Sequence, residues 1–295
     1  MEEAVMSGIC EADKEGEEIR CKYCGNSHVV KYGHYKGVRR WWCKDCKRKF
    51  AYNEALPKMK TPAVQIASAL SDFYEGSSIN VVRRNLDKTY GNYPSDTAVY
   101  YWIKKFTEVL IDAVVNIDEE YKTHISDIWI ADETVLKIEG QKLWFWEVLC
   151  ARTRFLLSYH VSFTRTTRDA QNLVERSARR AGKLPKVFIT NNLSAYQDGI
   201  ELAFGADTKH IPARNLAHQP SAYLSLHGTL KTRAKAMRSM KKKEAVKLVT
   251  DGWSAHYNFF KPQESLGGKT PAQKAGIRFP FRNWLDVLKY SSREF

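Results

Sequence analysis

Four cysteines near the start of the chain restrict its folding more tightly than any other feature. They form two Cys-x-x-Cys pairs with eighteen residues between them: Cys21 and Cys24, then Cys43 and Cys46. Each pair turns tightly enough to direct two thiolates at one tetrahedral Zn²⁺, with Zn–S distances of about 2.3 Å. The apolar and aromatic runs at 29–32 and 38–42 indicate a hairpin between the pairs. The segment 21–52 is therefore predicted to be a zinc ribbon, against the alternative of chance or disulfide-bonded cysteines.

The charge of the chain points to a polyanionic partner. Its 295 residues carry a formal net charge of +14, which suits DNA or RNA. Acids crowd the first twenty residues, so 1–20 is predicted to be an acidic disordered tail and the rest is more basic still. The sequence has no signal-peptide pattern and no apolar run of about 18 residues. We expect a cytoplasmic, nucleoid-associated protein without a membrane segment, where cysteines serve metal binding before disulfides.

The predicted ribbon is also rich in basic and aromatic residues. Arg39 and Arg40 precede Trp41 and Trp42, and further lysines follow. Such a surface can bind phosphates and stack on exposed bases. We predict DNA contact by Arg39 and Arg40, although the tryptophans could equally form the ribbon core and ribbons also contact proteins.

Residues 58–117 show the signals of three helices. Pro62 suits a first helical position, and Ser78 can cap a second helix. A third helix after Ser95 has an apolar stripe at Val99, Ile103, Phe106 and Leu110. Three helices with a tight middle connection fit a helix-turn-helix region, in which Lys104 and Lys105 would contact DNA. The alternative is a plain helical linker.

Residues 125–280 alternate strand and helix signals. Strands are predicted at 127–138, 143–150, 154–163 and 186–190, with a helix at 168–181 that ends at Gly182. The first strand carries Asp132, and the last ends at Thr190-Asn191-Asn192. Three consecutive strands, then a helix and a further strand, predict an α/β (α+β) domain with a mixed sheet. Residues 281–295 are assigned to a C-terminal tail.

Several linked motifs resemble the DDE-type transposases of prokaryotic insertion sequences. They are Trp129-Ile-Ala-Asp132-Glu-Thr, Phe188-Ile-Thr-Asn191-Asn-Leu-Ser-Ala-Tyr196, the 227–238 segment and His256-Tyr-Asn-Phe-Phe-Lys-Pro-Gln263. The resemblance implies a ribonuclease-H-like, integrase-like catalytic domain that cuts element ends and joins 3′-hydroxyls to target DNA. It also implies double-stranded DNA, including insertion-sequence ends, as partner, and at least a homodimer on that DNA.

The family pattern has three acids that hold two Mg²⁺ or Mn²⁺ ions, which activate the attacking oxygen and stabilise the leaving one. Asp132 matches the first acid. The second aligns to Asn191 and the third to Leu224, which lies on the basic face of its predicted helix. Two of three ligand acids are thus replaced, so this copy is predicted to bind the two ions poorly and to be inactive, a pseudoenzyme.

Substitute ligands are scarce. Glu133 adjoins Asp132, but neighbours on a strand point to opposite faces. Asp198 is the next acid after the fourth strand. Gln263 stands where the family pattern usually has His, a third departure. A basic run survives in the same predicted helix as Leu224 and is predicted to contact phosphates: Lys231, Arg233, Lys235 and Arg238.

Three functions remain open from the sequence. The first is an insertion-sequence transposase by descent that is catalytically impaired. The second is a non-enzymatic DNA-binding regulator or repressor derived from such a transposase. The third is an active nuclease with unusual ligands around Asp132, Glu133 and Asp198.

Overall fold

The computed structural model describes residues 18–35, 38–52, 55–115, 125–138, 141–212 and 243–292. The chain divides into two units, Met1–Pro62 and Ala63–Arg293, and each is described by itself. None of the described helices combines the length and the apolar character that a membrane crossing requires.

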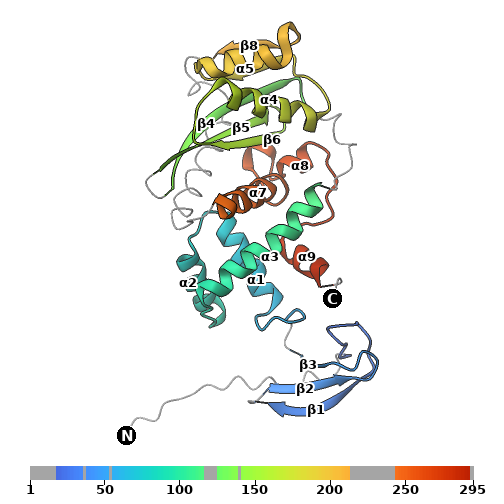
Figure 1. The fold of residues 1–295 in the computed structure, drawn as a ribbon. Coiled ribbons are helices and arrows are strands. Elements are labelled where there is room, and N and C mark those ends of the chain that lie inside the picture. Colours follow the sequence, from blue (N-terminus) through green and yellow to red (C-terminus); the bar gives the residue numbers. More distant parts are fainter. Residues whose placement is uncertain are drawn as a thin grey trace. The chain divides into compact units, whose positions relative to one another are not determined.

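The first unit is built on a three-stranded antiparallel sheet. Strands β1 (Val29–Tyr35), β2 (Val38–Cys43) and β3 (Lys49–Ala51) lie in this order (Figure 1). A small core of Cys21, Cys43 and Phe50 is buried on one side of it. The predicted hairpin between the two cysteine pairs is therefore present.

The second unit contains a five-stranded mixed sheet in the order β6-β5-β4-β7-β8. Its first three strands form an antiparallel meander, and β7 and β8 add to β4 in parallel. The strands are β4 (Ile128–Ile138), β5 (Gln141–Cys150), β6 (Leu156–Ser162), β7 (Val187–Thr190) and β8 (Lys209–Pro212). The four predicted strands are present, and β8 is an addition to them.

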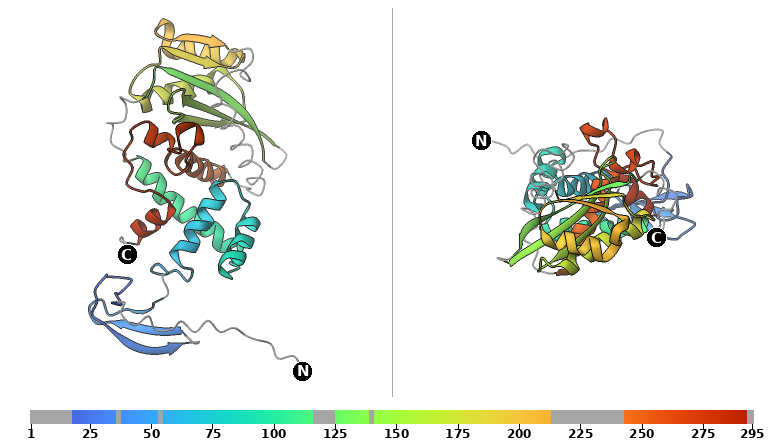
Figure 2. Two further views of the ribbon diagram at one scale, coloured as in Figure 1. Left: turned by 180° about the vertical axis from the view of Figure 1, so that it is seen from behind. Right: turned by 90° about the horizontal axis from the view of Figure 1, so that it is seen from above.

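Helices cover both faces of this sheet (Figures 1 and 2). On β5, Phe145 packs edge-on against Trp253 of α7 (Lys243–Phe259), whereas its neighbour Trp146 packs against Tyr196 of α5 (Ser194–Phe204). Because neighbours on a strand point to opposite faces, α5 and α7 lie on opposite sides of the sheet.

Helix α4 (Thr167–Ala181) packs beside α5, and its ends follow from the sequence. Thr166 and Asp169 form a reciprocal capping box at its start, which satisfies two otherwise unpaired backbone N–H groups. Gly182 ends it with φ 66°, a left-handed conformation that a residue without a Cβ adopts at little cost. The prediction of a helix at 168–181 is confirmed to within one residue.

The remaining helices form a bundle around the far side of α7. They are α1 (Ala63–Tyr74), α2 (Ile79–Tyr90), α3 (Asp96–Val115) and α9 (Trp284–Ser291). The predicted stripe of α3 is buried, and the Ser78 hydroxyl accepts the backbone N–H of Val81 at 3.4 Å. Helix α9, in the segment assigned to a tail, packs on α1 and α3. The shorter helices η2 (Gly205–Asp207), η5 (Glu264–Leu266) and α8 (Pro271–Lys274) connect larger elements.

A buried polar contact joins α1, α7 and α9. The indole N–H of Trp284 donates to His256 Nδ1 at 3.2 Å, so the ring hydrogen lies on Nε2, which contacts Glu75 Oε1 at 3.0 Å. This bond, together with Lys261, lowers the pKa of Glu75 to about 2. Tyr74 stacks on both His256 and Trp284. Three helices distant in sequence are thus held at one point.

We predict that Gly252→Ala destabilises this junction. A Cβ at Gly252 would lie 2.3 Å from the Tyr74 hydroxyl and 2.5 Å from Thr107 Cγ2, and those two side chains already hydrogen-bond each other. Overpacking of this kind costs about 1–3 kcal/mol, which lowers the Tm by several degrees. Thermal unfolding measures it. Lys247→Ala on the exposed face of the same helix is the control, and an equal Tm for the two variants would contradict the prediction.

Candidate functional site

Two of the predicted site residues meet at the edge where β7 ends. Ala131 of β4 pairs in parallel with Thr190 of β7, so the residues that follow them, Asp132 and Asn191, lie next to each other. Asn191 Nδ2 donates to Asp132 Oδ1 at 2.6 Å. The structure therefore brings together the residues at the first and second acid positions of the resemblance.

Glu133 joins the same contact, contrary to the expectation from strand alternation. Asn191 Nδ2 lies 3.0 and 2.9 Å from its two carboxylate oxygens. Alternation does hold within the sheet. Asp132 pairs with Glu147 and Glu133 with Trp146, and paired residues share a face, so the two acids leave β4 on opposite faces. Asn191, however, lies just past the end of β7, where one amide group reaches both neighbouring carboxylates.

The orientation of the Asn191 amide follows from its partners. Its oxygen accepts the backbone N–H of Leu193 at 3.0 Å, and its nitrogen faces the two carboxylates. The reversed amide would direct oxygen at two acceptors and N–H at a donor, so this orientation alone satisfies every group. Amide hydrogens thus lie between Asp132 and Glu133.

A guanidinium group also lies at the cluster that Asp132, Glu133 and Asn191 form. Arg165, in the connection before α4, pairs with Glu133 and lies 4.4 Å from the ring centroid of Trp144. Burial raises the pKa of Glu133, and the charge of Asp132 adds to this, while Arg165 and Asn191 oppose it. Burial, followed by the negative charge of the nearby carboxylates, raises the pKa of the enclosed Tyr196 well above its usual value.

Sequence reasoning did not select Arg165, Tyr196 or Glu147. Arg165 gives no signal in the sequence, since it lies in a polar connection. Glu147 does give one: it is the single acid in the apolar strand β5, and it is almost fully buried. Burial of an acid among apolar residues is unusual and signals a specific environment. Its pair on β4 is Asp132.

Two other residues considered from the sequence, Asp198 and Gln263, have their own hydrogen-bond partners. Asp198 is exposed on α5 and accepts a hydrogen bond from Thr167 at 3.4 Å. Gln263 is buried, and its side-chain oxygen accepts from Arg154 at 3.3 Å. Five predicted site residues fall outside the described residues: Leu224, Lys231, Arg233, Lys235 and Arg238.

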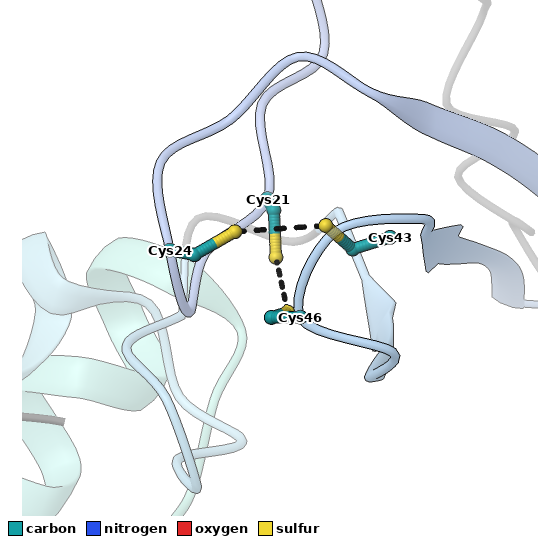
Figure 3. A group of neighbouring side chains, drawn as sticks. All are labelled: Cys21, Cys24, Cys43 and Cys46. Carbon is teal, nitrogen blue, oxygen red and sulfur yellow. Dashed lines mark hydrogen bonds between the residues drawn. The ribbon is translucent and has the colours of Figure 1, made fainter.

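The four cysteines of the first unit converge on one point (Figure 3). Their sulfur atoms all lie within 4.8 Å of one another, with Cys21–Cys46 and Cys24–Cys43 separations of 3.5 Å. Tetrahedral zinc with Zn–S of about 2.3 Å requires sulfurs about 3.8 Å apart. Backbone N–H groups of the second pair, from Cys46 first, lower the pKa of Cys43 to about 7. The donor set and its spacing therefore fit a zinc ion.

The predicted DNA contacts among the described residues differ in exposure. Arg40 is exposed and lies over the ring of Tyr35, while Arg39 is half-buried and contacts His34. On α3, Lys104 is exposed and Lys105 is half-buried beside the ring of Phe106. All four remain predictions.

Fold and site together define a mixed-sheet α/β domain with an acid on its central strand. Residues 126–263, a little under half of the chain, match the model of a family described as a DDE domain. This part of the chain is therefore similar to DDE domains, which confirms the resemblance, and the mixed sheet confirms the predicted fold class.

Comparison with curated proteins finds no match. Similar solved structures include the HTLV-2 integrase catalytic core domain in complex with magnesium, at 17% identity and a TM-score of 0.41, covering 50% of this chain and 95% of that one. Another is the simian T-cell lymphotropic virus intasome in complex with PP2A regulatory subunit B56 gamma, at 15% identity and a TM-score of 0.42, covering 53% and 56%.

We predict that Asn191→Asp destabilises the metal-free protein. The change removes both donated hydrogen bonds and adds a third carboxylate, at a cost of about 1–3 kcal/mol. One carboxyl of the enlarged cluster then has a raised pKa in the folded state, so the loss should be larger at about pH 8 than at about pH 5, where protonation relieves the repulsion.

Thermal unfolding at the two pH values measures this effect, and Asn192→Asp at the exposed neighbouring position is the matched control. Mn²⁺ should raise the Tm of Asn191→Asp, because anionic oxygens bind this ion, and should not raise it once Asp132→Ala is added. Equal stability of the Asn191→Asp and Asn192→Asp proteins would contradict the interpretation of the amide contacts.

Proposed function

We propose that this protein is an insertion-sequence transposase by descent that binds double-stranded DNA but is impaired in strand cleavage and joining. The observation that carries the proposal is the Asn191 amide, which donates to Asp132 and Glu133. In a working site of this family, two Mg²⁺ or Mn²⁺ ions would supply the chemistry by activating one oxygen and stabilising another.

The contacts of Asp132, Glu133 and Asn191 disfavour two such ions. Asp132 and Glu133 offer carboxylate oxygens, but the amide hydrogens of Asn191 occupy the space between them, and Arg165 already neutralises Glu133. Hard dications need several anionic oxygens, and a neutral amide donor in their place repels a cation. Leu224, at the position of the third acid, offers no ligand atom.

Binding of DNA is supported by charge and exposure. The chain carries +14 net charge, and Arg40 and Lys104 are exposed in the two regions that the sequence assigns to DNA contact. Phosphate contacts need only cations and donors, so they survive the loss of metal ligands. A homodimer or larger assembly on DNA is proposed by analogy with the family.

A non-enzymatic regulator or repressor is favoured by the same observation. A protein that binds element ends without cutting them competes with an active relative for those ends. Such a regulator needs the DNA-binding surfaces but not the third acid. The contacts of Asn191 are therefore as consistent with a regulator as with an impaired transposase. Repression of a reporter placed behind the bound sequence distinguishes this role from that of an inert remnant.

Cleavage assays test the proposal directly. On duplex DNA carrying candidate element ends, with Mn²⁺, we expect no cleavage by the natural chain or by Asn191→Asp alone. Asn191→Asp combined with Leu224→Glu should raise cleavage by about 100-fold or more, because it restores the charge of the ligand set. All three proteins should bind the duplex with similar affinity. Cleavage by the natural chain that Asp132→Ala abolishes would contradict the impairment.

We also propose that the cysteine cluster holds structural zinc. One zinc ion per chain is expected by metal analysis, and Cys43→Ser should lose it, since three thiolates bind far more weakly than four. Cys150→Ser is the matched control: this buried cysteine lies outside the cluster and should leave zinc content unchanged. Full zinc retention by Cys43→Ser would show that the cluster is not the site.

A further inference from the structure

The sheet of the first unit has two unlike faces. Trp41 pairs with Phe50, and both belong to the core around the cysteines. Their neighbours Trp42 and Lys49 form the next pair across the same strands and point to the opposite face. The sheet therefore turns one face to its own core and the other away from it.

The outward face carries aromatic rings with cations beside them. The rings of Tyr32 and Trp42 are 6.0 Å apart, and Lys49 Nζ lies 3.9 Å from the centroid of Tyr32. Arg40 lies 4.7 Å from the centroid of Tyr35. Tyr32 is 49% exposed and Tyr35 56% exposed. We call these five residues the aromatic–cation face: Tyr32, Tyr35, Arg40, Trp42 and Lys49.

Strong positive charge accompanies these rings. The described residues of β1, β2 and β3 include no acid. In the remaining described part of the first unit, Glu18 pairs with Arg20 and Asp45 lies 3.4 Å from His28. A polyanion that approaches the described strands therefore meets basic side chains and no carboxylate on them.

We propose that the aromatic–cation face binds single-stranded DNA by base stacking. Base faces in a duplex are covered by their neighbours, so a duplex can use the cations of this surface but not its rings. An unpaired strand can use both: its bases stack on the tyrosines, and its phosphates meet Lys49 and Arg40. Half-exposed rings among cations are what such a strand requires, whereas cations alone would suffice for duplex phosphates.

This inference rests on the proposed function only in taking DNA as the ligand. It adds that the first unit prefers unpaired strands, such as those present where DNA ends are opened. Duplex DNA would use cations of both units but not these rings.

The test uses the full chain with its zinc content verified. Fluorescence anisotropy measures binding to a labelled mixed-sequence strand of about 12 nucleotides and to the same sequence as a duplex. Tyr32→Leu combined with Tyr35→Leu removes two rings and keeps apolar bulk. Tyr290→Leu on α9, also about half exposed, is the matched control. The ring variant should bind the single strand ~10-fold or more weakly, with little change for the duplex.

Three results would overturn the inference: no single-strand binding by the natural chain, equal losses for strand and duplex, or no loss at all. Should the ring variant lose zinc, the natural chain is tested by photocrosslinking to a strand containing 5-iodouracil. Crosslinks within β1 or at Trp42 are expected, and crosslinks confined to the second unit contradict the inference. Absence of duplex binding by the natural chain would refute the proposed function and leave this inference standing.

Discussion

The packing of α7 between two surfaces is the constraint on which the second unit depends. Gly252 lets the helix approach Tyr74 and Thr107 of the helical bundle, while the next residue, Trp253, packs on Phe145 of the sheet. Successive residues of a helix point about 100° apart, so one helix serves both surfaces. The helices that precede the sheet are consequently joined to the strand that carries Asp132, and the proposed DNA contacts on α3 share one unit with that strand.

The carboxylates of Asp132 and Glu133 are stabilised by donor and cationic groups of the chain itself. Asp132 and Glu133 approach one point, and close carboxylates repel each other unless positive or donor groups intervene. The Asn191 amide and Arg165 supply those groups from within the chain. The raised pKa of Glu133 indicates that burial still disfavours its charged form despite these partners. The amide of Asn191 thus satisfies both carboxylates from within the chain.

The main elements could be predicted because their causes are local. Capping at Thr166 and Gly182 sets the ends of α4, and the apolar runs set β4 to β7. Strand β8 has four residues, mostly exposed and ending in Pro212, so it depends on pairing with β7 rather than on its own pattern. The contact of Asn191 with Glu133 was missed for a similar reason. Alternation describes the side chains of β4 alone, whereas this contact is made by a residue that follows the end of β7.

The charge of the cluster bears on whether a metal-free domain can still approach DNA. Two ionised carboxylates would repel phosphates, and in the family bound dications reverse that field. Here the guanidinium group of Arg165 pairs with Glu133 and offsets its charge. These acids lie within a chain of net charge +14. Because Arg165 offsets one of the carboxylates and the whole chain is basic, the proposed binding of DNA and the proposed impairment of catalysis are physically compatible.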